Sequence, residues 1–129
     1  MKATMRRRPA GFTLIELLVV MAIVALLLTI AVPRYFGSLA HAKDTALREN
    51  LKVLRVSLDK YASDKGHFPA ALDDLVTAKY LRAVPLDPLT ESAQTWVLAQ
   101  AEAGDEHGIV DVHSGAPGAD REGLAYADY

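Results

Sequence analysis

The stretch of sequence that decides the fold is RPAGFTLIELLVVMAIVALLLTIAVP, which runs from Arg8 to Pro33. Between Phe12 and Val32 it contains 21 residues and a single charged side chain, Glu16. A helix of this length, at about 1.5 Å per residue, covers the hydrocarbon core of a bilayer, which is about 30 Å thick. Residues 1–11 carry four basic side chains and no acid, so this end is expected in the cytoplasm and the body outside it.

Two simpler interpretations of the apolar stretch are a secretory signal peptide and a plain membrane anchor. A signal peptide has a shorter apolar region of about 7–15 residues, followed by a cleavage site with small residues. Here Ala31-Val32-Pro33 would place a proline directly at such a site. A plain anchor explains the length and the orientation but not Glu16, because a carboxylate at the bilayer centre costs about 2.5–3.5 kcal/mol and usually marks a function.

Glu16 is the fifth residue after Gly11. If a peptidase cuts between Gly11 and Phe12, the new amino group of Phe12 is a cation in apolar surroundings. Glu16 of a neighbouring subunit could neutralise it, and opposite charges of this kind are tolerated in a low dielectric only as a pair. The spacing therefore predicts subunits that are staggered along this helix.

The string Arg8-Pro-Ala-Gly11-Phe12-Thr-Leu-Ile-Glu16-Leu-Leu-Val-Val resembles the class III signal of type IV pilins and type II secretion pseudopilins. The resemblance implies that a prepilin peptidase removes residues 1–11 as a leader and methylates the new N-terminus at Phe12. It also implies that Glu16 is the assembly glutamate and that Pro33 kinks the helix, since proline removes a helical hydrogen bond and clashes with the preceding turn. Residues 12–33 would form the transmembrane and filament-core helix, and residues 34–129 a periplasmic pilin-like globular domain that includes the C-terminal half of the helix.

The helical pattern resumes after Pro33 with apolar residues spaced by four, three, four and three. This spacing puts them on one face, and they are Leu47, Leu51, Leu54, Leu58 and Tyr61. The other face is charged and includes Asp44 and Arg48. The helix is predicted to run from Phe12 to about Ser63, with Gly66 as its C-terminal stop. We expect the leucine face to pack on the rest of the body, and a coiled coil is the weaker alternative because too few heptads are present.

The remainder of the body predicts a short helix, a hairpin and a loop tail. Residues 70–81 read as the helix, with Pro69 suited to its first turn. Residues 84–88 read as a rigid connection, and residues 95–99 and 108–113 as two strands joined by a polar loop. Residues 114–129 are rich in glycine and read as a tail. The expected fold class is α+β: a long N-terminal helix packed on a small C-terminal antiparallel sheet, as in pilins.

This order of elements also resembles the major type II pseudopilin. The similar tracts are residues 66–69, 84–88, 111–115 and 119–123, while Asp87-Pro-Leu-Thr-Glu-Ser departs from the tract usual in that subfamily. The resemblance implies a calcium ion in the tail, held by Asp120 and Asp128 with further oxygens at Ser114 and Gly115. Calcium accepts six to eight hard oxygen ligands from loops. The alternative for the tail is a solvated acidic loop.

Composition excludes several other functions. The chain has no cysteine, which rules out disulfides and thiolate chemistry and separates it from typical type IVa pilins. Outside residues 1–11 it has 10 basic and 16 acidic side chains, so a nucleic-acid partner is not expected. The four histidines show no zinc-ligand spacing. On a strand Asp111 and His113 share one face while Ser114 points away, so they cannot form a catalytic triad, and we expect no enzymatic activity.

The function that we predict is that of a structural subunit of the type II secretion pseudopilus, a filament that drives protein export across the outer membrane. The resemblance implies a homo-oligomeric helical filament, and as partners the prepilin peptidase, an inner-membrane assembly platform and minor pseudopilins. It implies a single-pass inner-membrane protein with its C-terminal domain in the periplasm, where the assembled pseudopilus also lies. The alternatives are a type IV pilus subunit for adhesion, motility or DNA uptake, and a membrane-anchored periplasmic domain that never polymerises.

Overall fold

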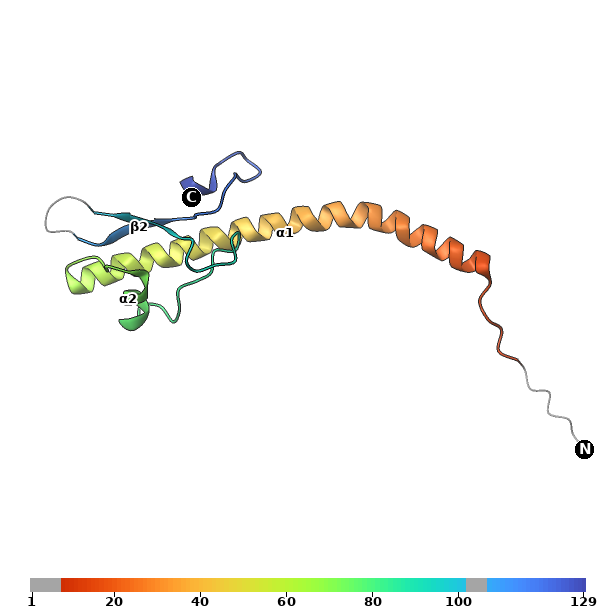
Figure 1. Ribbon diagram of the computed structural model, residues 1–129, viewed down its shortest axis with the longest axis horizontal. Coiled ribbons are helices and arrows are strands. Elements are labelled where there is room, and N and C mark those ends of the chain that lie inside the picture. The colour runs from red at the N-terminus through yellow and green to blue at the C-terminus, as the bar shows by residue number, and fades with distance from the viewer. Residues whose placement is uncertain (1–7, 102–106) are drawn as a thin grey trace, which may run out of the picture. The chain divides into compact units, whose positions relative to one another are not determined.

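The computed structural model describes residues 8–101 and 107–129 (Figure 1). The chain forms two compact units, residues 1–38 and residues 39–129. Helix α1, Leu14–Lys65, contributes to both units. The described part of the first unit consists of the N-terminal part of this helix and the few residues that precede it. The leader predicted for residues 1–11 lies mostly outside the described residues.

Helix α1 begins two residues later than predicted because Thr13 caps it. The Thr13 hydroxyl oxygen accepts a hydrogen bond from the Glu16 N–H at 3.2 Å, which satisfies one of the free donors of the first turn. The helix then continues through Pro33 without a break, so the proline does not melt it locally. It ends at Lys65 rather than near Ser63, and Gly66 follows in the left-handed conformation with φ 78°, as expected of a C-terminal stop.

The leucine face of α1 forms the core of the second unit. Leu47, Leu54 and Leu58 are fully buried and Leu51 is 1% exposed, which confirms the predicted stripe. They pack in one cluster with residues from the other elements, including Leu72, Leu75, Trp96, Ile109, Val112 and Tyr129. The predicted alternative of a coiled coil is not needed for this face, because the chain's own body covers it.

Helix α2, Leu72–Thr77, is shorter than the predicted residues 70–81. Pro69 is not in its first turn: it lies before the helix, and its carbonyl accepts a hydrogen bond from Ile109 N at 2.8 Å. The helix stops early because Lys79 takes the left-handed conformation with φ 67°. The N–H groups of Tyr80 and Leu81 then turn back to bond the carbonyl of Leu75.

The sheet has two antiparallel strands, β1 (Val97–Gln100) and β2 (Ile109–His113). Val97 pairs with His113, and the register shifts between Ala99 and Gln100. Both predicted strands are present: β1 begins two residues later and ends one residue later than predicted, and β2 begins one residue later. Residues 102–106 of the predicted hairpin loop lie outside the described residues. With the 3-10 turn η1, Tyr126–Asp128, the long helix and the small antiparallel sheet make an α+β, pilin-like fold.

Candidate functional site

The predicted processing and assembly residues lie together at the start of α1. Gly11 and Phe12 precede the helix, and the Phe12 side chain is 91% exposed. Glu16 lies in the first turn. A hollow of about 210 Å³ is lined by Phe12, Glu16, Leu17 and Val20. Among the residues that the structure describes, Glu16 makes no ion pair, so its carboxylate is available to a group from outside this chain.

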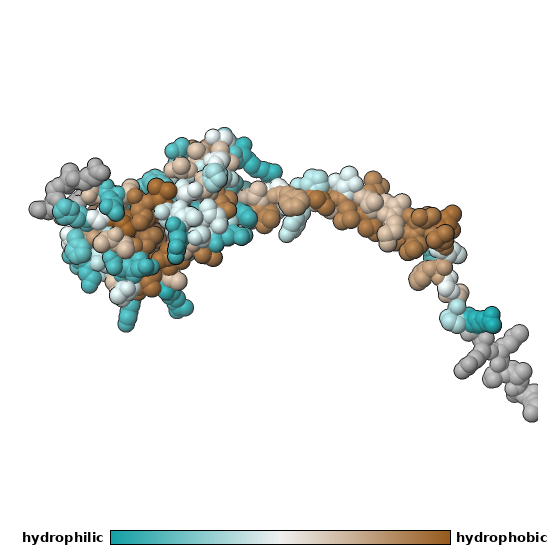
Figure 2. Space-filling model, in the orientation of Figure 1, coloured by the Kyte–Doolittle hydropathy of each residue, from teal (hydrophilic) through white to brown (hydrophobic). Residues whose placement is uncertain are grey.

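The first unit leaves its apolar side chains uncovered. Leu14, Leu26 and Ile30 are each more than 60% exposed, and the most hydrophobic 18-residue window of α1 has no buried share. Figure 2 shows this hydrophobic surface along the N-terminal part of the helix. The helix is long and apolar enough to cross a membrane. Such a continuous apolar surface is stable in water only when lipid or another protein covers it.

The second unit holds the predicted tail ligands, and they differ in exposure and in partners. Asp120 is 9% exposed as a residue and Ser114 is 1% exposed, whereas Asp128 and Gly115 are at the surface. The hydroxyl of Ser114 donates to Asp87 Oδ2 at 2.6 Å. Within residues 8–101 and 107–129, no group of three or more His, Asp or Glu side chains could hold a metal ion.

Asp120 is instead held by protein groups. Its Oδ1 accepts hydrogen bonds from the N–H groups of Glu122 and Leu124 at 3.0 and 2.9 Å. Its Oδ2 accepts from the Tyr129 hydroxyl at 2.5 Å and lies 3.3 Å from Arg48 Nη2. The Tyr129 hydroxyl and these main-chain N–H groups hold the pKa of the Asp120 carboxyl below its usual range. Burial, with the neighbouring Asp120 charge, raises the pKa of Tyr129 to about 12.

These contacts do not fit the predicted calcium ion. A carboxylate has about four lone-pair positions, and four donors already surround that of Asp120. A calcium ion bound at 2.3–2.6 Å would have to displace donors and would lie close to the Arg48 guanidinium, which repels it. Calcium binding by this tail stays a prediction, and the arrangement of Asp120 argues against it.

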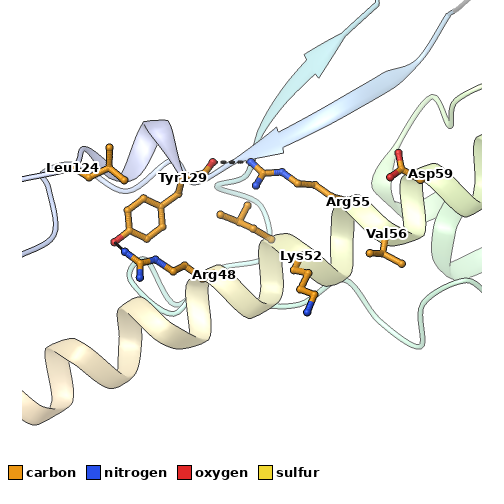
Figure 3. A pocket seen from close by; sticks show the side chains of 8 residues that line it. Arg48, Lys52, Arg55, Val56, Asp59, Leu124 and Tyr129 are labelled. Atoms are coloured by element: carbon orange, nitrogen blue, oxygen red, sulfur yellow. Dashed lines mark hydrogen bonds between the residues drawn. The ribbon is translucent and has the colours of Figure 1, made fainter. Parts of the chain in front are cut away.

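Arg48 and Arg55 of α1 were not singled out by the sequence, yet both hold the tail. Figure 3 shows them beside a pocket of about 360 Å³, with Tyr129 between them. Arg48 Nη2 donates to the Tyr129 hydroxyl at 3.1 Å. Arg55 Nη2 donates to the main-chain oxygens of Tyr129 and Val112 at 2.7 and 3.0 Å, and its Nε pairs with Asp111 Oδ1 at 2.8 Å.

Asp44 is buried although it belongs to the charged residues of α1. It is 7% exposed, and its Oδ1 accepts a hydrogen bond from the Tyr126 hydroxyl at 2.9 Å. Burial, together with this carboxylate, raises the pKa of Tyr126. The signal that could have found Asp44 is its position three residues before Leu47, on the same helical face as the leucines.

Comparison with known proteins places these features in a family. Residues 6–32 match the prokaryotic N-terminal methylation motif. The chain is 30% identical to type II secretion system core protein G of Escherichia coli K12, over 91% of this chain and 86% of that protein. The chain belongs to the type II secretion system core protein G family. The protein of the same name from Klebsiella pneumoniae is also 30% identical, over 86% of each chain.

One type IV pilin is similar to part of the chain. The type IV major pilin protein PilA of Myxococcus xanthus is 38% identical over 61 residues, which are 47% of this chain and 28% of the pilin. No solved structure matches this chain. Similarity along most of the chain therefore favours core protein G over the type IV pilins, as the absence of cysteine also does.

Proposed function

We propose that this protein is the structural subunit of a type II secretion pseudopilus and that it polymerises through the N-terminal part of α1. The proposal rests on the structure of the first unit, which is an uncovered apolar helix. Its first turn holds one carboxylate, Glu16, beside Phe12. Before assembly, lipid would cover this surface, with the second unit in the periplasm. In the filament, the same surface of neighbouring subunits would replace lipid.

Phe12 and Glu16 have complementary parts in this proposal. Prepilin peptidase would cut after Gly11 and methylate the Phe12 amine, which then carries a positive charge. The carboxylate of Glu16 on the adjacent subunit would pair with it, since either charge alone is costly in apolar surroundings. An inner-membrane platform would add subunits, minor pseudopilins would join them in the fibre, and growth would move exported proteins through the outer membrane. The role is mechanical and includes no catalytic step by this chain.

The experiment is to compare Glu16→Ala with Thr29→Val as a matched control in the same helix. Among the described residues, the Thr29 hydroxyl bonds only to the carbonyl of Ala25 in the preceding turn, and its replacement removes no charge. We expect Glu16→Ala to abolish fibres in sheared fractions while intact mass still shows cleavage after Gly11, and Thr29→Val to assemble normally. Normal fibre yield from Glu16→Ala would overturn the pairing.

Three outcomes separate the alternatives. Wild-type fibres together with loss of exoprotein secretion on gene deletion support the pseudopilus. Surface fibres whose loss affects adhesion, motility or DNA uptake, with secretion intact, would show a type IV pilus. A wild-type chain that is cleaved and stably inserted but never forms fibres would show a membrane-anchored periplasmic domain.

A further inference from the structure

Residues 114–129 carry too little apolar surface for burial alone to offset the entropy cost of ordering them. The sizeable apolar or aromatic side chains in this tail are Leu124, Tyr126 and Tyr129, and Leu124 is 45% exposed. Ordering each residue costs about 1–2 kcal/mol of backbone entropy. Polar contacts must therefore contribute, and a buried carboxylate in them requires a counter-charge.

The counter-charge for Asp120 comes from α1. The Asp120 side chain is 1% exposed, and its nearest cation among the described residues is Arg48, 3.3 Å away. The Arg48 guanidinium also donates to the Tyr129 hydroxyl, and its Cζ lies 4.9 Å from the centre of the Tyr129 ring. The Tyr129 hydroxyl in turn donates to Asp120, which closes a ring of three mutually bonded side chains.

Arg55 holds the same residue from its other side. It bonds the main-chain oxygen of Tyr129 at 2.7 Å, while Arg48 bonds the hydroxyl of that side chain. The two arginines are seven residues apart, or about two helical turns, and so lie on neighbouring parts of one face of α1. Figure 3 shows the two guanidinium groups reaching Tyr129 from separate turns of the helix.

We propose that Arg48 neutralises the buried Asp120 carboxylate in this protein, as a bound divalent cation would, so that the tail packs on α1 without a metal ion. The latch consists of Arg48, Asp120 and Tyr129, and Arg55 fixes the main chain of the same tail. The Arg48 guanidinium neutralises Asp120 at any calcium concentration. The subunit then folds, and through the proposed function assembles, independently of calcium in its compartment.

The first test is thermal unfolding of the full-length protein in detergent micelles, followed by the fluorescence of its single tryptophan. Trp96 is 7% exposed in the core of the second unit and reports the unfolding of that unit. We expect the same Tm in millimolar calcium chloride as in EDTA. A Tm that rises with calcium, and that no longer rises in Asp120→Asn, would overturn the proposal.

The second test compares Arg48→Gln with Lys52→Gln. Lys52 lies one turn along α1 and lines the same pocket, but it forms no ion pair within the described parts of the chain. In EDTA we expect Arg48→Gln to lower the Tm by up to about 4–8 °C, which is the shift that a loss of about 1 kcal/mol gives in a domain of 60–100 residues. We expect Arg48→Lys, which keeps the charge, to lie between it and wild type. An Arg48→Gln variant that melts with wild type and Lys52→Gln would refute the latch.

Failure of the latch is distinguishable from failure of the proposed function. Fibres that form in calcium but not in EDTA, with a calcium-dependent Tm, would leave the pseudopilus role standing and remove the metal-free latch. Fibres that form in neither condition, with a Tm unaffected by calcium, would support the latch and remove the assembly role. Fibres in both conditions support both.

Discussion

Replacing Arg55 with methionine should destabilise the second unit strongly, because this one side chain joins α1 to β2 and to the tail. It makes hydrogen bonds to Asp111, to the carbonyl of Val112 and to the main-chain oxygen of Tyr129. Methionine keeps most of the aliphatic stem of the arginine, so the loss is mainly of these three contacts.

The magnitude follows from how exposed each contact is. The Arg55 and Asp111 side chains are 37% and 40% exposed, so their ion pair contributes at most about 1 kcal/mol. Each of the two charged bonds to main-chain oxygens contributes about 1–2 kcal/mol, since Val112 is fully buried and Tyr129 is 8% exposed. The expected loss in the free energy of unfolding is therefore about 2–5 kcal/mol.

Urea unfolding of the full-length protein in micelles, followed by Trp96 fluorescence, measures this loss. With a slope of about 1–3 kcal/mol per molar urea, the midpoint should fall by roughly 1–3 M. Lys52→Met is the matched control on the same face and should shift the midpoint by less than about 0.5 M, as surface substitutions usually do. An Arg55→Met midpoint equal to that of the control would show that the three hydrogen bonds make no net contribution to stability. It would refute the proposed role of Arg55 in joining α1 to β2 and the tail.

Three further predictions concern the core, the pH dependence and processing. Leu54→Ala should cost about 2–5 kcal/mol in the same urea assay, because it opens a cavity at a fully buried position; a loss below about 1 kcal/mol would contradict the packing. Although burial favours its neutral form, the hydrogen bonds from Arg55 and from the Val112 N–H keep the pKa of Asp111 below its usual range. Its contribution to stability is therefore present above about pH 4 and is lost as the pH falls through the lowered pKa, and Asp111→Asn should flatten this acid limb in urea midpoints measured against pH. Intact-mass analysis of protein from the native membrane should show residues 1–11 removed and one added methyl group on Phe12; a mature N-terminus beyond Pro33 would refute the pilin-type processing.

Helix α1 and its buried face could be predicted because they depend on local spacing. The four leucines from Leu47 to Leu58 repeat with helical periodicity, and the single glycine that follows stops the helix whatever the tertiary context. The same holds for the start of the site, where Gly11, Phe12 and Glu16 lie within six residues of one another. Features that depend on residues a few positions apart can be predicted from the sequence directly.

The end of α2 could not be predicted in the same way. Residues 78–81 continue a helical pattern, yet Lys79 adopts a positive φ that lysine rarely takes. The turn lets Tyr80 contact Tyr61, with ring centres 5.5 Å apart, and lets its hydroxyl bond Asp64 at 2.7 Å. These contacts with the end of α1 lie more than 15 residues away in sequence, so tertiary packing overrides the local preference.

The tail shows how a physical expectation can leave the holding partner open. Its composition required a group other than apolar side chains to hold it, and the sequence suggested a bound cation because acidic oxygens were the visible feature. The structure also provides holding groups from α1, 72 residues before Asp120 in the case of Arg48. Each arginine directly follows a buried leucine, Arg48 after Leu47 and Arg55 after Leu54, so each lies at the border of the buried face. A long basic side chain at such a border can lay its stem along the core and still place its charge on an adjacent segment. A repeat of leucine followed by arginine at seven-residue spacing thus indicates, in a chain with an acidic tail, which face of the helix that tail will cover.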